Sequence, residues 1–502
     1  METALLRRFT RSRLASTTCP CLLRSTFIPF NNTSFRSSRH VTPSQLISRS
    51  SYSTAPAPKT QLPTTPHPRK RPLIALGIET SCDDTCAAIV TSDRQILSEV
   101  LRTQHHLHEP MGGIVPKLAH HAHMRNLPSV VQEAIQSAGL GERGIQAIDV
   151  IAVTRGPGLA HCLGVGLNAA KTLAAALNKP LIGVHHMEAH ALTARLTTRD
   201  PDLPTQDASS SESSVPIGSD PYPSFPFLTL LVSGGHTMLL VAHSVDRYTT
   251  LATTLDDSIG EAFDKTAREL DIPWLPGRAG GPGASLEEFA KGSTDPERYL
   301  NRLPIPLSLR SGKSEMKFSF AGLKSAVTRI VNQEKAGSPI GEMDENKRQD
   351  LAAGFQNCAV THLCQKVEQA LVDCHEQGMD ISSLVISGGV GRNATLRSRM
   401  DEICSRFEHG GAIATDKMSS KEKKKLKRGS SLNATAASKE TTTRAARPVR
   451  VICPPPKLCT DNAVMIAWTG LERYQQGLTD PYDIDIVPKW PLDMLGTGIV
   501  PE

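Results

Sequence analysis

Three histidines and a glutamate follow a short apolar run in the segment LIGVHHMEAH, which extends from Leu181 to His190. The run predicts a strand, and the HHMEAHALTARL sequence around its end predicts a helix. Because His186 and His190 are four residues apart, their imidazoles leave one face of that helix and can bind the same divalent ion. We therefore predict a metal site at His186 and His190.

The same histidine spacing occurs in the HExxH motif of zinc peptidases, where a glutamate directly follows the first histidine. Here Glu188 lies two residues after His186, which is about 200° around a helix. Its carboxylate would face away from the bound ion and cannot serve as a general base there. The spacing therefore excludes a peptidase of this type.

A third ligand is available in the segment CTDNAVMIAW, in which Asp461 and Asn462 precede a predicted helix. Asp461 can cap that helix or complete the ligand shell of the ion, and the segment alone leaves both roles open. Two histidines and one carboxylate with open coordination positions suit an ion of the iron or zinc type.

Two distant segments share the pattern of strand, polar turn and strand. The first has strands at Leu73–Gly77 and Cys86–Thr91, and the second lies within Pro226–His243 around the turn Ser233–His236. The backbone N–H groups of such turns suit phosphate oxygens. Strands alternate with helices elsewhere, which predicts an α/β fold, and the repeat predicts two similar domains facing a cleft. Two unrelated hairpins are the alternative.

The N-terminal segment has the composition of a targeting sequence. No Asp or Glu occurs from Thr3 to Ile78, while arginines recur among Ser and Thr. This pattern predicts a mitochondrial transit peptide over residues 1–52, followed by a Pro-rich linker over 53–71. No apolar run in the 502 residues approaches the ~20 that a membrane-spanning helix needs, so we predict no membrane insertion.

Charge is distributed unevenly along the chain. The net charge is +6, but residues 1–71 contribute +11 and residues 416–450 contribute +8, which leaves about −13 for the rest. An acidic folded part does not by itself indicate a nucleic-acid partner. Residues 197–224 are polar and Pro-rich and residues 415–448 are basic and of low complexity, so both are predicted to be disordered insertions. The two domains are then predicted at 72–196 and 225–495.

Nine motifs in a fixed order carry a resemblance to one family. They are GIETSCDDT, GGIVPKLAHHAH, VTRGPGL, HHMEAH, LLVSGGHT, GEAFDKTAREL, FSFAGLK, SGGVGRNATLR and CTDNAVMIAW. The chain resembles the tRNA N6-adenosine threonylcarbamoyltransferases of the TsaD type over roughly Leu73 to Leu495, and its N-terminus resembles that of a mitochondrial member. The resemblance implies the fold shared by actin, sugar kinases and heat-shock chaperone ATPases, with two duplicated α/β domains around a nucleotide cleft.

The resemblance also implies an acyltransferase reaction. Threonylcarbamoyl-AMP, supplied by a separate synthase, would donate its threonylcarbamoyl group to N6 of adenosine 37 in tRNAs that read codons beginning with A, in the mitochondrial matrix. His186, His190 and Asp461 would bind one divalent ion per subunit, either iron or zinc, and we expect a homodimer. The residues implied to bind the adenylate are Leu231, Val232, Ser233, Gly234, Gly235, Asp264, Gly281 and Asn393.

Asp83 and Asp84 lie at the first of the two turns and are candidate catalytic residues with an electrostatic role. Aspartates are also common turn residues without any role in catalysis, and this alternative remains open.

The sequence departs from the family pattern at several positions. Lys117, His120 and His121 stand where many members have an acidic residue followed by a Ser-Arg pair, so the role of that helix in tRNA binding is open and an additional metal site is conceivable. Leu231 replaces a tyrosine of cytosolic and archaeal members and cannot bind a metal. With an acidic core, tRNA binding would depend on local patches such as the basic insertion or Arg302, Arg310, Lys313 and Lys317.

Three other functions are weighed against the transferase. A small-molecule kinase or ATPase on the same fold would use Mg²⁺, which is held mainly by carboxylates and water rather than by a histidine pair. A dinucleotide-binding protein is suggested by GVGRNA at Gly389–Ala394, but this motif lacks the acidic residue at the usual distance. A non-catalytic scaffold with the same fold is the third alternative.

Overall fold

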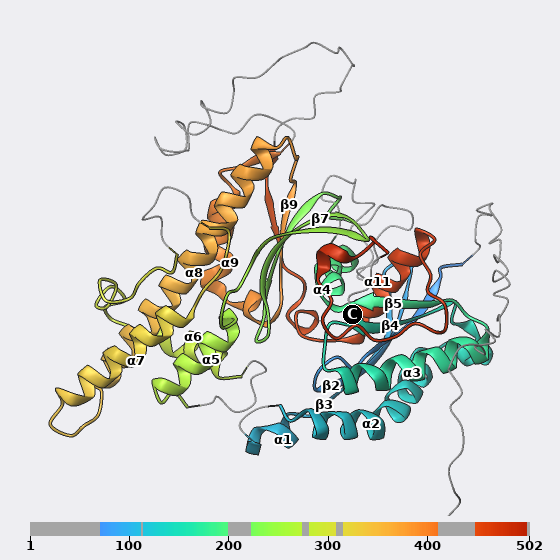
Figure 1. Cartoon of the computed structure of the whole chain (residues 1–502), viewed down its shortest axis with the longest axis horizontal. Helices are drawn as coiled ribbons and strands as arrows, with labels where there is room; N and C mark the ends of the chain where they lie inside the picture. Colours follow the sequence, from blue (N-terminus) through green and yellow to red (C-terminus); the bar gives the residue numbers. More distant parts are fainter. Residues whose placement is uncertain are drawn as a thin grey trace, which may run out of the picture. The chain divides into compact units, whose positions relative to one another are not determined.

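The computed structural model describes residues 71–111, 114–198, 222–273, 281–307, 315–409 and 447–498. Within these residues the chain forms two five-stranded sheets with helices packed against them (Figure 1). The predicted transit peptide, most of the predicted linker and most of both predicted insertions lie outside the described residues. Arg310 and Lys313 of the predicted basic patch lie outside them too.

The first sheet has the strand order β3-β2-β1-β4-β5. β1, β2 and β3 are antiparallel neighbours, whereas β4 and β5 extend the sheet parallel to β1. β1, β2, β4 and β5 are almost entirely buried, as expected for strands covered on both faces. The bounds are β1 (Ile74–Glu79), β2 (Asp84–Thr91), β3 (Ile96–Thr103), β4 (Val150–Gly156) and β5 (Leu181–His185).

The second sheet repeats this topology in the order β8-β7-β6-β9-β12. Again three antiparallel strands come first in sequence, and two strands parallel to the first of them follow. The repetition of both order and direction confirms the predicted duplication. The bounds are β6 (Phe227–Val232), β7 (Thr237–Ser244), β8 (Arg247–Thr253), β9 (Ser383–Ser387) and β12 (Arg450–Ile452).

The helices also occupy equivalent places in the two repeats. α3 and α9 each connect the fourth strand of their sheet to the fifth, and α4 and α11 each follow the fifth strand. In the described ranges, no helix combines the length and the apolar character needed to cross a membrane. The first repeat has α1 (His105–His108), α2 (Pro116–Ser137), α3 (Ala160–Leu177) and α4 (His186–Thr197). The second has α5 (Ile259–Glu269), α6 (Gly281–Ala290), α7 (Ala321–Ala336), α8 (Glu345–Glu376), α9 (Ala394–Cys404) and α11 (Ala463–Gln475).

α11 lies against the first sheet, although the sequence analysis placed it in the C-terminal domain at 225–495. It packs on β1, β2 and β4 and against α4. Gly77 of β1 permits this approach, because a Cβ there would lie 2.3 Å from the Ala463 carbonyl oxygen and 2.5 Å from the Ala467 nitrogen. The segment after α11 stays with the first sheet as well, since Val487 donates its N–H to the Arg155 carbonyl at 2.9 Å. α11 and the segment after it therefore pack with the first sheet, although they follow the second sheet in sequence.

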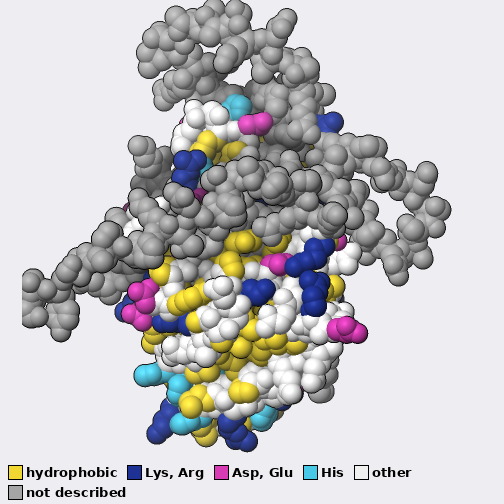
Figure 2. Space-filling view, turned by 90° about the vertical axis from the view of Figure 1, so that its right-hand side faces the viewer, with side chains coloured by type: hydrophobic (Ala, Val, Ile, Leu, Met, Phe, Trp, Pro, Cys, Tyr) yellow, Lys and Arg dark blue, Asp and Glu magenta, His cyan; other side chains and the backbone are white. Residues whose placement is uncertain are grey.

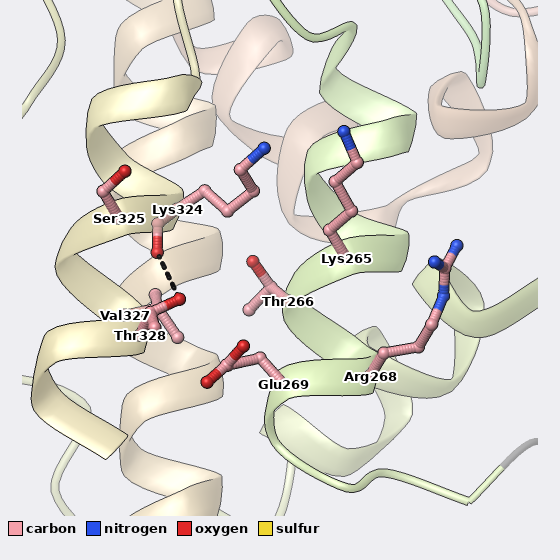
Figure 3. Close-up of a pocket in the computed structure, with 8 residues that line it drawn as sticks. All are labelled: Lys265, Thr266, Arg268, Glu269, Lys324, Ser325, Val327 and Thr328. Carbon is pink, nitrogen blue, oxygen red and sulfur yellow. Dashed lines mark hydrogen bonds between the residues drawn. The ribbon is translucent and has the colours of Figure 1, made fainter. Parts of the chain in front are cut away.

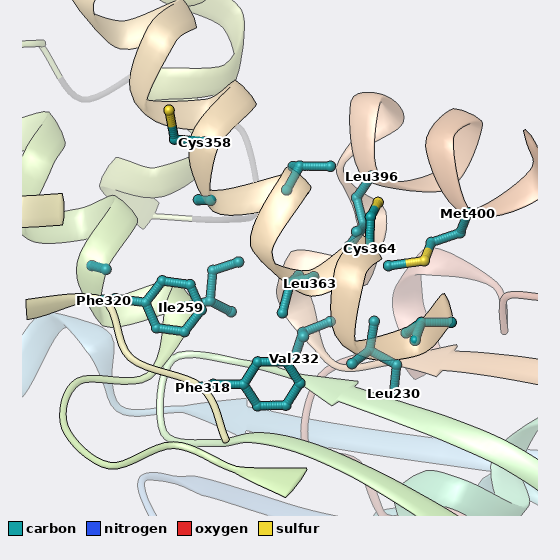
Figure 4. Close-up of a cluster of buried hydrophobic side chains, with 14 of the residues drawn as sticks. Leu230, Val232, Ile259, Phe318, Phe320, Cys358, Leu363, Cys364, Leu396 and Met400 are labelled. Carbon is teal, nitrogen blue, oxygen red and sulfur yellow. The ribbon is translucent and has the colours of Figure 1, made fainter. Parts of the chain in front are cut away.

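The second repeat has a separate apolar core between its sheet and α5, α7, α8 and α9 (Figure 4). Leu230 and Val232 reach it from β6, and Phe318 and Phe320 reach it from the segment before α7. His362 of α8 is also fully buried there, and its ring centroid lies 5.6 Å from that of Phe320. This core fixes α5, which carries residues of the candidate site.

The edges of three predicted disordered segments are structured. Arg71, at the end of the predicted linker, pairs with Asp149 at 2.8 Å. Tyr222 is buried, and its hydroxyl lies 3.1 Å from Ser383 Oγ. Residues 447–448 form β11 (Arg447–Pro448), which pairs with β10 (Glu408–His409). The insertions predicted at 197–224 and 415–448 are thus too long at these ends, because their terminal residues have partners in the fold.

Candidate metal centre

α4 begins at His186 because His185 caps it. The Nδ1 atom of His185 accepts the N–H of Met187 at 3.1 Å, and the carboxylate of Glu188 accepts the N–H of His185 at 3.3 Å. The other ring nitrogen donates to the Trp490 carbonyl at 2.9 Å. Burial lowers the pKa of His185 to about 3, so its ring is neutral. His185 is therefore a structural cap of α4, whereas His186 and His190 are available to bind a metal ion.

The structure brings His186, His190 and Asp461 together. Their potential ligand atoms lie within 4.8 Å of one another. Asp461 Oδ1 is 3.3 Å from His186 Nε2 and 3.2 Å from His190 Nε2. Both histidines are buried, and no other such group of three occurs in the parts of the chain described.

Asp461 is free for this role because Asn462 caps α11. The side-chain oxygen of Asn462 accepts the N–H of Met465 at 2.9 Å. The capping role considered for Asp461 is therefore wrong. Since α4 and α11 follow equivalent strands in the two repeats, the three side chains come from equivalent helix starts on opposite sides of the duplication.

Glu79, which the sequence analysis did not select, connects this cluster to the first turn. Its side chain is 1% exposed. Glu79 Oε2 accepts from His186 Nδ1 at 3.1 Å and from the hydroxyl of Thr154, while Oε1 accepts the N–H of Ser81. A carboxylate on Nδ1 holds the ring so that Nε2 faces the cluster, as is usual for metal-binding histidines. No periodic signal in the sequence marked Glu79, because the predicted strand ended at Gly77, two residues before it.

The carboxylates of the cluster attract positive charge. Burial disfavours a charge on His186, but Asp461 and Glu79 outweigh it and raise the pKa of His186 to about 10. Burial likewise opposes the charge on Asp461, yet His186 and His190 hold the pKa of this carboxyl well below its usual range. An ion bound here would displace the proton of His186, because a metal binds only the neutral imidazole. Two neutral imidazole nitrogens and one ionised carboxylate are a donor set that zinc and iron accept, so the residues present fit the implied metal.

Glu188 faces away from the cluster, as the exclusion of an HExxH peptidase requires. It is fully buried and lies 3.2 Å from Arg473 of α11. Burial raises the pKa of Glu188 to about 7, and the Arg473 guanidinium opposes this shift. Glu188 thus joins α4 to α11.

The first turn, between β1 and β2, lies beside the cluster. Ser81 Oγ is 3.4 Å from His186 Nδ1. Asp83 is half-buried at this turn. The Oδ1 atom of Asp84 is buried without a hydrogen-bond partner among the described residues. Burial, together with the charges of Asp83 and Asp461, raises the pKa of Asp84 to about 7. This turn therefore lies close enough to the cluster for the charge of Asp461 to affect the pKa of Asp84.

Hydrogen bonds from α2 and from the start of α3 hold this first turn in place. His123 of α2 donates from Nε2 to the Cys82 carbonyl at 3.1 Å, and its Nδ1 accepts the hydroxyl of Thr85 at 2.8 Å. Burial lowers the pKa of His123, consistent with a neutral ring. Leu159, just before α3, donates its N–H to the Ser81 carbonyl at 2.8 Å.

The second turn, between β6 and β7, approaches the cluster from the other repeat. Ser233 Oγ accepts the N–H of His236 at 3.0 Å, which shapes the turn. Gly234 and Gly235 are exposed, and no atom lies within 4 Å of the position of an added Cβ. Burial, together with charges on His186 and His190, lowers the pKa of His236 to about 4, which indicates that this turn is near the cluster.

The remaining predicted adenylate residues are placed as follows. Leu231 and Val232 are buried in β6. Asp264 Oδ1 accepts the N–H of Gly283 near the start of α6, where Gly281 lies, at 2.7 Å. Asn393 caps α9, and its amide donates to Gln356 at 2.8 Å. α6 also contacts the start of α9, because Glu287 accepts the Ala394 N–H at 2.9 Å. Asp264, Gly281 and Asn393 therefore lie around α6, and among the described residues none of these three has a hydrogen bond to His186.

A cavity of about 400 Å³ lies elsewhere, between α5 and α7 (Figure 3). None of its lining residues belongs to the predicted site, and Lys265 and Lys324 both reach the carboxylate of Asp257. The lining residues are Lys265, Thr266, Arg268, Glu269, Lys324, Ser325, Val327 and Thr328. We assign the chemistry to the histidine cluster, which has the donor groups that this cavity lacks.

Comparison with known proteins identifies the family. The family model TsaD, described as tRNA N6-adenosine threonylcarbamoyltransferase, matches residues 95–213 and 214–410. The chain belongs to the TsaD family of transferases. A relative from Arabidopsis thaliana, named "Probable tRNA N6-adenosine threonylcarbamoyltransferase, mitochondrial", is 38% identical over 434 residues, covering 84% of this chain and 75% of the relative. A TsaD relative from Sphingopyxis alaskensis is 37% identical over 420 residues, covering 84% and 96%.

Solved structures show a weaker likeness. The (R)-2-hydroxyglutaryl-CoA dehydratase component A of Acidaminococcus fermentans is 11% identical, covers 80% of this chain and 99% of its own, and has a TM-score of 0.38. A ROK family glucokinase from Streptomyces griseus is also 11% identical, covers 80% and 100%, and has a TM-score of 0.32. The fold assignment comes instead from the TsaD match and the repeated strand order. These confirm the predicted α/β fold of the actin, sugar-kinase and heat-shock-chaperone class.

Proposed function

We propose that this TsaD-family protein transfers the threonylcarbamoyl group of threonylcarbamoyl-AMP to N6 of adenosine 37, in tRNAs that read codons beginning with A. The observation that carries the proposal is the approach of the first hairpin turn to the cluster of His186, His190 and Asp461, where Ser81 Oγ lies 3.4 Å from His186 Nδ1. Turns of this kind suit an adenylate phosphate, and the cluster suits a metal ion beside it.

The proposed reaction requires little bond making or bond breaking by the protein itself. The donor is a mixed carboxylic–phosphoric anhydride and is already activated. The N6 lone pair attacks the carbamoyl carbon, a C–N bond forms, the C–O bond to the phosphate breaks, AMP leaves and N6 loses a proton. The protein must therefore orient two reactants and stabilise charge on the carbonyl and phosphate oxygens.

We assign these tasks to residues around the two turns. The backbone at Gly234 and Gly235 would approach the adenylate phosphate, since nothing fills the space beside it. Asp264 already accepts the Gly283 N–H through Oδ1, which leaves Oδ2 for a ribose hydroxyl. Asp83 and Asp84 would act electrostatically at the first turn. An iron or zinc ion bound by the histidine cluster would supply a Lewis acid for the reacting oxygens.

We propose the mitochondrial matrix as the site of action. The acid-free, Arg-rich segment over residues 1–52 has the composition of a transit peptide, and the Arabidopsis thaliana relative is named as mitochondrial. The donor is a reactive anhydride that must be made before transfer, and we propose that a separate synthase supplies it. We also propose that the protein acts as a homodimer.

Reconstitution tests the proposed function. The purified protein would be incubated with tRNA, threonine, bicarbonate, ATP and a threonylcarbamoyl-AMP synthase, and the tRNA nucleosides would be analysed by mass spectrometry. We expect modified adenosine with the wild type, little or none with His186→Ala, and wild-type yield with His375→Ala, a matched change at the end of α8. Rapid ATP hydrolysis without tRNA and no modified adenosine would instead favour a small-molecule kinase or ATPase.

A further inference from the structure

α3 and the part of α2 up to Gln132 contain no carboxylates, whereas Glu133 near the end of α2 pairs with Arg102. No Asp or Glu occurs in residues 110–132 or 150–187, although the folded part of the chain is acidic overall. α2 and α3 pack side by side (Figure 1). Turned to the right-hand side of the molecule, the surface shows His, Lys and Arg side chains gathered at its lower end, at the height of α1 and α2 (Figure 2). This is an unusual charge distribution for a protein whose remaining surface must be acidic.

Five residues form the centre of this surface, which we call the histidine patch: Lys117, His120, His121, Arg125 and His161. Lys117, His121 and Arg125 are exposed and follow one another at four-residue spacing, so they form a stripe along α2. His120 links the stripe to α3, since its ring lies 5.6 Å from that of His121 and 5.8 Å from that of His161.

The hydrogen bonding of His120 leaves a ring nitrogen for a partner. His120 Nδ1 donates to the His161 carbonyl at 3.0 Å, and Nε2 has no hydrogen-bond partner among the described residues. No ion pair to Lys117 or Arg125 occurs among the residues the structure describes. The patch therefore combines two cations free of carboxylate partners with three imidazoles, a set suited to phosphates and stacked bases.

The turn between β1 and β2 connects the histidine patch to the metal cluster. His123, on the same helix as the stripe, donates to the Cys82 carbonyl at 3.1 Å, and Ser81 in this turn lies 3.4 Å from His186. Leu159, two residues before His161, donates to the Ser81 carbonyl at 2.8 Å. A nucleic acid that delivers an adenosine to the cluster would thus pass the starts of α2 and α3.

We infer that the histidine patch binds the RNA substrate next to the modified adenosine, with Lys117 and Arg125 on backbone phosphates and the imidazoles against unpaired bases. This inference rests on the proposed function for the identity of the RNA. It assigns a role in tRNA binding to Lys117, His120 and His121, the positions at which this chain departs from the family pattern. In this chain, the altered residues form the binding surface.

Direct binding tests the inference separately from catalysis. The probe is a fluorescein-labelled transcript of a tRNA that reads a codon beginning with A, and fluorescence anisotropy is measured over a salt series. For Lys117→Gln/Arg125→Gln we expect binding at least ~10-fold weaker, and a slope of log K against log salt that is smaller by about 1.4 to 1.8, because each phosphate contact contributes ~0.7–0.9. The matched control Arg329→Gln/Lys335→Gln on α7 should bind as the wild type does.

The outcomes separate this inference from the proposed function. Wild-type binding and salt dependence in the patch variant would overturn the inference even if modified adenosine forms. Binding that depends on the patch would support it even if no modified adenosine forms, and the proposed function alone would then fail. Leu118 and Met124 of α2 are 36% and 54% exposed and would suit a protein surface instead. A patch variant that changes the oligomeric state in light scattering, with tRNA affinity unchanged, would therefore also overturn the inference.

Discussion

Glu79 determines how His186 is presented to a ligand. Its carboxylate accepts from His186 Nδ1 and at the same time from Ser81 and Thr154, so it couples the metal cluster to the first turn and to β4. Hydrogen bonds of this kind fix the tautomer of a ligating imidazole and increase its basicity. Glu79 is thus a positioning residue that would not touch the ion itself.

Replacing Glu79 by Gln should weaken metal binding while retaining the size of the side chain. We expect zinc affinity to fall ~10–100-fold, because the imidazole loses its charged partner. The measurement is competition for Zn²⁺ between the protein and a chromophoric chelator. The control is Glu99→Gln, a carboxylate of the same sheet that lies 3.9 Å from Lys457. Unchanged zinc affinity in Glu79→Gln would contradict the assigned role.

The predicted metal-binding residues could be selected from the sequence, but Glu79 could not. His186 and His190 have the spacing of one helix turn, which any sequence reveals. Asp461 was a candidate only through the family resemblance, since it is 271 residues from His190. Glu79 was missed because the predicted strand ended at Gly77, whereas β1 continues to Glu79 and buries it. A charged residue at the end of a buried strand gives no periodic signal.

At the scale of elements, α4 and α11 are joined by two buried ion pairs. Arg195 lies 2.9 Å from Glu472, and Glu188 lies 3.2 Å from Arg473. Each pair has one partner on each helix. His186 and His190 lie in α4, and Asp461 lies just before α11, so the pairs join the two elements that carry the predicted metal ligands.

Breaking one pair should destabilise the fold more than removing both partners. Arg473→Met leaves Glu188 buried without its cation, and we expect a loss of ~3–5 kcal/mol in the free energy of unfolding. The double variant Glu188→Gln/Arg473→Met should recover most of this loss. Urea denaturation followed by circular dichroism measures both. A double variant as unstable as Arg473→Met would show that packing, and not the unpaired charge, causes the effect.

The core of the second repeat contains a pH-sensitive element. His362 of α8 is fully buried and accepts the N–H of Ser319 at 3.3 Å. Burial lowers its pKa from 6.5 to about 4. Above pH 6.5 neither the folded nor the unfolded state protonates this ring. As the pH falls from 6.5 to 4, only the unfolded state gains the proton, so stability is lost in this window.

His362→Gln should make the free energy of unfolding less dependent on pH between pH 6.5 and pH 4. The glutamine can still accept the Ser319 N–H but cannot be protonated, so a loss of ~3 kcal/mol between pH 6.5 and pH 4 should be absent. Urea unfolding at several pH values measures the difference, with His106→Gln, an exposed change, as the control. The same decline in His362→Gln as in the wild type would contradict the buried, neutral state of this ring.

The order of the elements was largely predictable, whereas their packing across the duplication was not. The repeated strand, polar turn and strand pattern indicated two similar domains. The apolar pattern of α11 shows that the helix is buried but not which sheet covers it. Gly77, where any side chain would collide with the α11 backbone, marks the contact only once the structure is known.

At the scale of the whole molecule, the strands on either side of residues 410–446 pair with each other. The two ends of this basic segment are held together, because Glu408 pairs with Pro448 and His409 pairs with Arg447 in the β10–β11 sheet. A short turn could therefore replace residues 410–446 without displacing either strand. The positive charge of this segment can add to RNA binding, and none of the three residues of the metal cluster lies within it.

Replacing residues 410–446 by a two-residue Asn-Gly turn should leave stability and metal content unchanged. We expect the midpoint of thermal unfolding to stay within ~4 °C of the wild type, since about 1 kcal/mol shifts a domain by that much or less. Differential scanning calorimetry and metal analysis provide the readouts. A large fall in the midpoint would mean that the insertion contributes to the core.

The central claim is that His186, His190 and Asp461 hold an ion that the transfer reaction needs. The most direct measurement is single-turnover transfer from purified threonylcarbamoyl-AMP to tRNA, by chelator-treated protein and by the same protein reloaded with Fe²⁺ or Zn²⁺. The predicted result is little modified adenosine without metal and its return with one of the two ions, but no return in Asp461→Asn. Equal yields from metal-free and reloaded protein would contradict the claim.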